Sequence, residues 1–376
     1  MLEISISNLE NPPSEWPEAF TYKEDVGQLE LRLADYRWVK NVILVGNGGA
    51  ITSFDAYYGA LKPKIKSATV WTMEPDFIDD VISRFDKKST IVVAVSKSGN
   101  TMGMLEALFS LAGYKVLAVT NPNEGILSQI AKKMKWPVTA HPPVGGRFSG
   151  GTSAAFVPAI LCGINAKKIQ EGISSGYSLK KEAYTLSKYL FELEKKGYQE
   201  VFVPIYSTRL VQFENLIVQL MHESVCKDGK GQTFYCSAGP ECQHHTSQRF
   251  FGGKKNTVGL FIVAKDTEKD HNINIPDSLS DLPYKSSTLS VIDSLSAQGG
   301  VLAEFIGTQQ CASQLGVPNV IIEVERVTEK SVGMLVGFWH MIAYYSALLR
   351  GVDAFDQPAV EESKNISFEE IRNLKK

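Results

Sequence analysis

The chain has 376 residues, of which 44% are hydrophobic and 21% are charged. This composition is typical of a folded protein with two domains of ordinary size or one large α/β unit, and it excludes a disordered chain. The 39 basic and 41 acidic residues give a formal net charge of -2, so no broad positive surface favours nucleic acid as a partner.

Several features bear on the cellular compartment. The start of the chain, MLEISISNLENPPSEW, has neither the basic nor the apolar segment of a signal peptide. The most apolar long stretch, residues 334–349, contains His340 and Ser346 and is short for a bilayer span, so we interpret it as a buried helix. Five cysteines, an odd number, favour reduced thiols over a disulfide framework. We expect a cytoplasmic protein without a membrane partner.

Apolar runs alternate with helical stretches along the first half of the chain. Residues 1–22 are polar and rich in proline, so we expect them to form a surface arm. This alternation favours a parallel sheet with helices on both faces. The pattern predicts strands at 41–45, 68–71, 90–95 and 116–119, and helices at 26–37, 52–60, 77–85 and 101–112.

The second half shows the same kind of alternation without a close sequence repeat. A buried helix ends near 158–163, and a charged helix at 179–196, expected to be exposed, follows it. The polar stretch 266–286 is interpreted as a long surface loop. The two halves join near residues 166–198, so the fold class is α/β with two domains. Strands are predicted at 200–205, 259–263, 289–292 and 319–324, and helices at 213–223, 299–315 and 332–349.

The sharpest local motif is SKSGNT at residues 96–101, which lies directly between a predicted buried strand and a helix. Ligands bind at the carboxyl ends of parallel strands, and the helix start supplies free N–H groups and the positive end of its dipole. The motif carries hydroxyl groups and is followed by no acidic residue before Glu106. A phosphate monoester therefore fits well, although a helix N-cap with spare serines is the plain structural alternative.

Two further observations narrow this ligand. No G-x-x-x-x-G-K-[ST] motif occurs, which makes a nucleoside triphosphate a poorer candidate. The turn at residues 46–50 (GNGGA) also follows a strand, but Ile51 stands where a dinucleotide fingerprint has its third glycine. We interpret this turn as a second loop that approaches the substrate.

Four more segments follow these loops along the chain. They are residues 145–149 (GGRFS), 219–224 (QLMHES) with 227–231 (KDGKG), 239–244 (GPECQH), and 355–361 (FDQPAVE) with Lys364. Together with SKSGNT they resemble, in order, the motifs of the phosphoglucose isomerase family, which has the sugar isomerase (SIS) domain fold. The resemblance extends from about residue 40 to about residue 366 and implies two SIS-type domains, each a mainly parallel sheet flanked by helices in three αβα layers.

The resemblance also divides the chain. We expect an N-terminal arm at 1–22, a first SIS-type domain with the SKSGNT loop at 23–166, and a second SIS-type domain at 167–350. The segment 351–376 is expected to carry the active-site lysine. In the family a histidine comes from the neighbouring subunit, so the resemblance implies a homodimer with a shared active site.

Roles for the catalytic residues follow from the motif match. Glu223 is the expected base, and Gln219, four residues earlier, shares its helix face. Arg147 is expected to stabilise the charge of an enediolate. His244 and Lys364 are expected to open the sugar ring. Without the match, each has a plain structural alternative, such as a solvated carboxylate for Glu223, a surface ion pair for Arg147, and an i,i+3 ion pair for Lys364.

The expected reaction is the interconversion of glucose 6-phosphate and fructose 6-phosphate through a cis-enediol. A dual phosphoglucose/phosphomannose isomerase and a non-catalytic phosphosugar-binding regulator stay open as alternatives. The expected substrate- and phosphate-binding residues are Gly48, Gly49, Ala50, Ser96, Lys97, Ser98, Gly99, Asn100, Thr101 and Gln219.

No cofactor is expected. Cys236, Cys242, His244 and His245 lack the usual spacing of a zinc site, and His245 and His222 are interpreted as structural. Ala50 stands where the family usually has serine, so a hydroxyl contact is expected to be absent or to move to Thr52 or Ser53.

Overall fold

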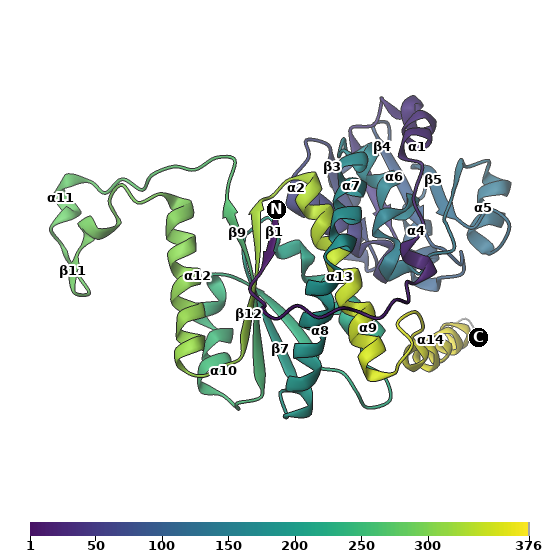
Figure 1. Ribbon diagram of the computed structural model, residues 1–376. Coiled ribbons are helices and arrows are strands. Elements are labelled where there is room, and N and C mark those ends of the chain that lie inside the picture. The colour runs from purple at the N-terminus through teal and green to yellow at the C-terminus, as the bar shows by residue number, and fades with distance from the viewer. Residues whose placement is uncertain (375–376) are drawn as a thin grey trace.

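The computed structural model describes residues 1–374 and contains two five-stranded sheets (Figure 1). Helices cover both faces of each sheet, and one large hydrophobic core lies between the two sheets. Smaller cores lie on the outer face of each sheet. The predicted α/β class with two mainly parallel sheets is therefore confirmed.

The first sheet is entirely parallel. Its strands are β2 (Asn41–Val45), β3 (Lys66–Val70), β4 (Thr90–Val95), β5 (Lys115–Thr120) and β6 (Val138–Ala140), in the order β3-β2-β4-β5-β6. All residues of β4 are buried, as expected for a strand covered on both faces. Because the strands are parallel, the loops after β2 and β4 lie at the same edge of the sheet.

Successive side chains of β2 point alternately to the two faces of the first sheet, and each face has its own hydrophobic core. Val42 and Leu44 point into the central core, whereas Ile43 and Val45 point into the outer core under α3, α4 and α5. The helices are α1 (Val26–Leu33), α2 (Thr52–Leu61), α3 (Pro75–Arg84), α4 (Met102–Ser110), α5 (Ile126–Met134) and α6 (Ser153–Leu161).

The second sheet has one antiparallel strand at its edge. Its strands are β1 (Leu2–Ile4), β7 (Glu200–Tyr206), β8 (Thr233–Ala238), β9 (Thr257–Asp266) and β12 (Asn319–Arg326), in the order β1-β12-β9-β7-β8. Leu2 pairs with Val324 in antiparallel register. The start of the expected surface arm is thus a strand, because alternate apolar residues there bury against the sheet, and Leu2 is 5% exposed.

Two helices pack closely at the centre of the molecule. The helices of this half are α7 (Ala166–Ser178), α8 (Lys180–Lys195), α9 (Glu214–Val225), α10 (Thr246–Gly252), α12 (Ala297–Gln314) and α13 (Glu329–Arg350). A Cβ on Gly172 would lie 2.1 Å from the carbonyl oxygen of Lys330, and one on Gly333 would lie 2.1 Å from that of Ile169. Only glycine at these positions lets the backbones of α7 and α13 approach so closely.

The buried helix predicted from the apolar stretch is α13, and it is longer than predicted. Its 22 residues are long and apolar enough to span a bilayer, but 83% of its most apolar window is buried inside the protein. The helix is therefore the core helix of the fold. The charged helix α8 packs against it through Ala183, Leu186 and Leu190. The expectation that this helix is exposed is therefore wrong for one of its faces, which is buried.

The polar stretch after β9 extends away from the second sheet (Figure 1). It contains α11 (Asp277–Ser280) and the two-residue strands β10 (Pro283–Tyr284) and β11 (Ser287–Thr288). The strand predicted at 289–292 is instead a 3-10 helix, η7 (Leu289–Ile292), with no buried residue. Its apolar run resembles a core strand, but no neighbouring strand pairs with it.

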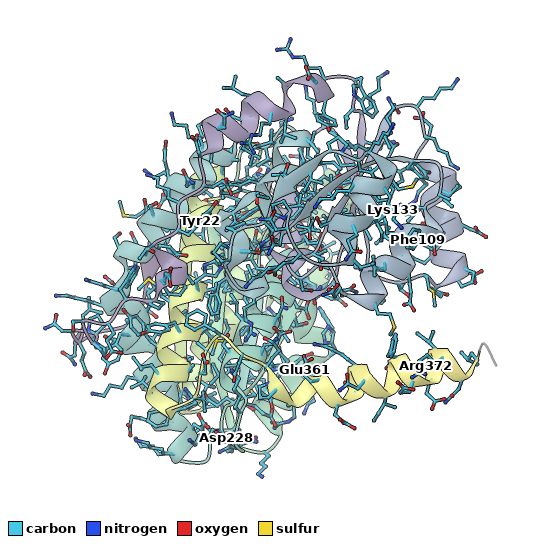
Figure 2. All side chains as sticks on the ribbon, turned by 90° about the vertical axis from the view of Figure 1, so that its right-hand side faces the viewer. Tyr22, Phe109, Lys133, Asp228, Glu361 and Arg372 are labelled. Atoms are coloured by element: carbon cyan, nitrogen blue, oxygen red, sulfur yellow. The ribbon has the colours of Figure 1, made fainter. Side chains whose placement is uncertain are left out.

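The C-terminal helix α14 (Glu361–Asn373) has no buried residue. Figure 2 shows it running outside the body of the protein between Glu361 and Arg372, and both views place it below the first sheet and its helices. The last two residues of the expected C-terminal segment, 375–376, lie outside the described residues.

A buried ion pair between Arg350 of α13 and Glu194 of α8 links the two helices. Arg350 Nε donates to Glu194 Oε2 at 2.7 Å, and Glu194 Oε1 accepts from the N–H of Gly231 at 2.8 Å. The side chains are 2% and 13% exposed. The pair is therefore largely removed from water, and losing one partner would leave an uncompensated charge.

We expect Arg350→Met to lower the free energy of unfolding by about 3–5 kcal/mol, because it leaves Glu194 buried and unpaired. Adding Glu194→Leu should recover part of the loss. Urea unfolding followed by circular dichroism measures both, and Arg372→Met, which breaks the exposed pair with Glu369, is the control that should change little. An unchanged midpoint for Arg350→Met would contradict this role.

Candidate active site

The first-sheet loop after β2 packs directly against the GGRFS segment. This loop forms the 3-10 helix η3 (Gly48–Ala50), and GGRFS lies at the start of η4 (Gly146–Gly151). A Cβ on Gly49 would lie 2.2 Å from the backbone nitrogen of Arg147. The glycine is therefore required so that the two loops can touch, and this contact fixes the backbone of Arg147 beside the carboxyl end of β2.

Helix α9 brings its QLMHES motif to the same place. Leu216, Leu220 and Ser224 face the core, whereas Gln219 and Glu223 lie on the half-buried face. Thr52 Oγ1 donates to Gln219 Oε1 at 2.9 Å, and Gln219 Nε2 donates to Glu223 Oε1 at 3.1 Å. This chain of hydrogen bonds orients the carboxylate from one side.

Arg147 holds the carboxylate from the other side. Its Nε lies 3.1 Å from Glu223 Oε2, and the Arg147 side chain is only 4% exposed whereas that of Glu223 is 36% exposed. Burial lowers the pKa of Arg147 from its ordinary value, and the negative charge of Glu223 opposes that shift. The pair thus combines a buried cation with a carboxylate that solvent or a ligand can reach.

The C-terminal FDQP segment explains why Arg147 can be buried. The guanidinium donates to the backbone carbonyl oxygens of Ala354 at 3.2 Å and of Asp356 at 3.1 Å, and to the side-chain oxygen of Gln357. The ring of Phe355 also packs on that of Phe148, with centroids 5.1 Å apart. Most donors of the guanidinium are therefore satisfied by protein, as a buried charge requires.

The SKSGNT loop leaves the start of α4 open to an anionic ligand. Gly99 has a φ of 67°, which lets the loop turn into α4. Ser96 Oγ accepts from the N–H of Gly99 at 3.1 Å and lies 3.1 Å from Thr101 Oγ1. Thr101 is the N-cap residue of α4 but its side chain makes no cap hydrogen bond, and no acidic residue lies in the first turn. The amides of that turn are free for an anion.

Asn47 connects this loop to the carboxylate. Its Oδ1 lies 3.4 Å from where a Cβ on Gly103, in the first turn of α4, would be. The next residue, Gly48, lies against Gln219, since a Cβ there would lie 2.9 Å from Gln219 Nε2. The anion site and Glu223 therefore border the same loop, and one small ligand with an anionic end can span them.

Some predicted binding residues of the loop face elsewhere in this structure. Lys97 Nζ donates to the carbonyl oxygen of Pro143 at 3.4 Å, and Asn100 Oδ1 accepts from the N–H of Ile126 at 3.0 Å. Their side chains support neighbouring loops. Ala50 packs against the central core, and the hydroxyl that follows it, Thr52, contacts Gln219.

The structure does not bring Lys364 to the carboxylate. Lys364 lies on α14, where its Nζ is 2.6 Å from Glu361 Oε1 and its side chain is 58% exposed. This is the i,i+3 pair that the spacing alone predicts.

His244 and Glu223 lie at opposite ends of one strand within the chain. His222, beside Glu223, accepts from the N–H of Phe234 at 2.9 Å, near the start of β8. His244 is exposed at the end of η6 (Glu241–His244), beyond the far end of β8. Because β8 spans roughly 15–20 Å, the two side chains do not meet inside one chain. His222 is structural, as predicted, and burial lowers its pKa.

The chain shows no preformed metal site in its described part. Across residues 1–374 no group of three or more His, Cys, Asp or Glu side chains is placed to hold a metal ion. All five cysteines are free, as expected. His245 Nδ1 lies 2.6 Å from Thr246 Oγ1, and Cys242 is buried whereas both histidines are exposed.

Several site residues escaped sequence reasoning. In the sequence Asn47 stands out only as part of a glycine turn. Trp71, whose carbonyl oxygen accepts from Asn47 Nδ2 at 3.0 Å, follows an edge strand and belongs to no motif. The backbone carbonyls of Ala354 and Asp356 carry no signal in residue type. The only sequence signal near them is the FDQP motif, which predicts a role for Lys364 and not for these carbonyl oxygens.

This α/β fold of parallel sheets flanked by helices is similar to that of a putative phosphosugar isomerase from Clostridium difficile, which matches with a TM-score of 0.55 at 13% identity, over 90% of this chain and 93% of that one. No protein-family model matches the chain. The glucose-6-phosphate isomerase of Methanocaldococcus jannaschii is 28% identical over 354 residues, covering 89% of this chain and 84% of that protein.

Two solved structures show the same fold. A hypothetical protein from Thermus thermophilus matches with a TM-score of 0.84 at 23% identity, over 94% of this chain and 89% of that one. A glucose-6-phosphate isomerase from Chlamydia trachomatis matches with a TM-score of 0.77 at 19% identity, over 95% and 78%. The resemblance to the phosphoglucose isomerase family is thereby confirmed over most of the chain.

We expect Ser96→Ala with Thr101→Ala to weaken the binding of inorganic phosphate about tenfold or more, because hydrogen bonds to a charged group are lost. Calorimetric titration measures the dissociation constant. Ser83→Ala, which removes an exposed hydroxyl bonded only to the carbonyl oxygen of Asp80 among the described contacts, is the matched control. Equal affinity in the double variant and the wild type would refute the anion site.

Proposed function

We propose that the chain interconverts D-glucose 6-phosphate and D-fructose 6-phosphate as an aldose–ketose isomerase. The observation that carries the proposal is the Arg147–Glu223 pair beside a loop that also borders the start of α4. The curated relatives support it, since several that match over about nine-tenths of this chain are named glucose-6-phosphate isomerase. The regulator and the dual-specificity alternatives have no comparable support.

The proposed reaction places the phosphate at the start of α4 and the open-chain sugar across the Asn47–Gly48 turn. Glu223 removes the proton from C2 of the aldose, and the electron pair forms the C1–C2 double bond of a cis-enediolate. Glu223 then returns the proton to C1, while the hydroxyl proton on O2 moves to O1, so that O1 becomes a hydroxyl group and the C2 oxygen becomes the ketone. A single carboxylate suffices because the two carbons are adjacent.

Arg147 has an electrostatic role in this scheme. When Glu223 accepts the proton, its negative charge moves to the enediolate oxygens, and the guanidinium is already beside that position. Because the protein's carbonyl oxygens hold it in place, it needs little reorganisation during the reaction. No step requires a metal or an organic cofactor.

We further propose a homodimer in which His244 completes the site of the neighbouring chain. The separation of His244 from Glu223 along β8 supports this arrangement. The extension between β9 and α12 also supports it, because it projects from the body and exposes Leu282, Tyr284 and Val291. Exposed apolar side chains on a projecting segment are typical of subunit contacts.

Ring opening is assigned to His244 and Lys364 on the motif match. Lys364 belongs to α14, and Figure 2 shows that this helix runs below the first sheet and its helices, so the role of Lys364 requires α14 to approach the site. The proposed location is the cytoplasm, and neither nucleic acid nor a membrane is a proposed partner.

We expect Glu223→Gln to lower turnover by about 10²- to 10⁴-fold, because the amide keeps the shape of the carboxylate but cannot accept the proton from carbon. Interchange of the glucose 6-phosphate anomers should persist, since ring opening uses other residues. Solvent exchange of the C2 proton by NMR measures the first effect. Glu214→Gln, on the same helix, is the control. Near-normal C2 exchange in Glu223→Gln would mean that another residue is the base.

If the active site is shared between two chains, two inactive variants should complement each other in a heterodimer. A heterodimer of one Glu223→Gln chain and one His244→Gln chain, each inactive as a homodimer, should contain one intact and one doubly altered site. Two different affinity tags on coexpressed chains allow its isolation, and its activity should be about half that of the wild type because a twofold dimer has two equivalent sites. An inactive heterodimer would mean that both residues act within one chain.

A further inference from the structure

A cavity lies at the opposite edge of the first sheet from the SKSGNT loop. It has a volume of about 540 Å³, and its floor is formed by Ile91 and Val116, near the starts of β4 and β5. The proposed active site is at the carboxyl ends of the strands, so the whole length of the sheet separates the two. This volume is within the range of about 300–1,000 Å³ that is usual for small-ligand pockets.

Aromatic side chains form the walls of this cavity. Tyr36, Trp38 and Trp136 line it, and the ring centroids of Tyr36 and Trp38 are 6.5 Å apart. Trp38 packs on the central core and Trp136 on the outer core of the first sheet, so the cavity straddles the sheet edge. All three side chains keep partial exposure. Their flat faces suit a planar ring, which stacks on aromatic side chains.

The charged side chains at the rim are not engaged in ion pairs. Arg32 and Lys115 line the cavity, and within residues 1–374 neither they nor the lining Asp35 forms an ion pair. Lys115 Nζ instead lies over the Trp38 ring, 4.0 Å from its centroid. Two cations against one carboxylate leave the rim with an excess of positive charge, which favours an anion.

We propose that this cavity binds a planar aromatic ring that bears an anionic group. The ring would stack between the indole faces of Trp38 and Trp136 over the apolar floor, and the anion would be held by Arg32 and Lys115. Displacing Lys115 from the face of Trp38 frees both the indole for stacking and the ammonium for the anion. The site is independent of the isomerase proposal and shares no residue with it.

Two classes of ligand have this chemistry, namely nucleotides, whose anionic group is a phosphate, and aromatic carboxylates. Calorimetric titrations of the full chain with AMP and with phenylacetate distinguish them. Ribose 5-phosphate has the phosphate without the ring and so corrects for binding at the SKSGNT loop, and adenosine has the ring without the charge. We expect saturable binding of AMP or phenylacetate and at least tenfold weaker binding of adenosine.

Variants test the assigned residues. Lys115→Gln and Trp38→Leu should each weaken the binding of the same probe about tenfold. The matched controls are Lys167→Gln on α7 and Trp16→Leu, which remove an exposed lysine and an exposed tryptophan elsewhere. Lys115 is exposed, so its variant should fold even if that of Trp38 does not.

Three results would overturn the proposal. The first is the absence of millimolar or tighter binding of both probes. The second is adenosine binding as tightly as AMP, or tetramethylammonium binding in place of the anions, because either would remove the role of Arg32 and Lys115. The third is equal weakening by Lys115→Gln and Lys167→Gln.

Discussion

The buried guanidinium of Arg147 joins three parts of the chain that are distant in sequence. Its backbone belongs to η4, its partner Glu223 belongs to α9, and most of its other donors are bound by Ala354, Asp356 and Gln357 in the segment after α13. A buried charge is stable only when its hydrogen-bonding groups are satisfied. The segment at 353–357 is therefore needed to complete the site, and it links the two sheets and the C-terminal segment at one point.

Much of the fold follows from the sequence because its parallel strands are covered on both faces. Runs such as IVVAV in β4 are uniformly apolar and predict either a buried strand or a buried helix, and the short length of the run favours the strand. Short edge strands lack a long apolar run and so cannot be predicted in this way. β1 has three residues and β6 has three, and the apolar run of η7 resembles a strand because local pattern does not reveal the absence of a pairing partner.

The site divides in a similar way between local and tertiary information. Glu223 and Gln219 are four residues apart on one helix, and GGRFS and SKSGNT are each an unbroken run of residues. Spacing and motif therefore predict these as candidate site residues. The contacts that align them come from backbone atoms and from Asn47, whose residue type carries no motif. His244 and Lys364 show the reverse, because their motifs are recognisable and yet neither reaches the carboxylate within one chain in this structure.

The first strand has a consequence for the order in which the chain folds. β1 pairs with β12, more than 300 positions later in the sequence, and the segment after β1 crosses from the second sheet to the first (Figure 1). During synthesis β1 is made long before its partner strand. The second sheet therefore closes late relative to its first strand, and β1 stays unpaired until β12 has been made.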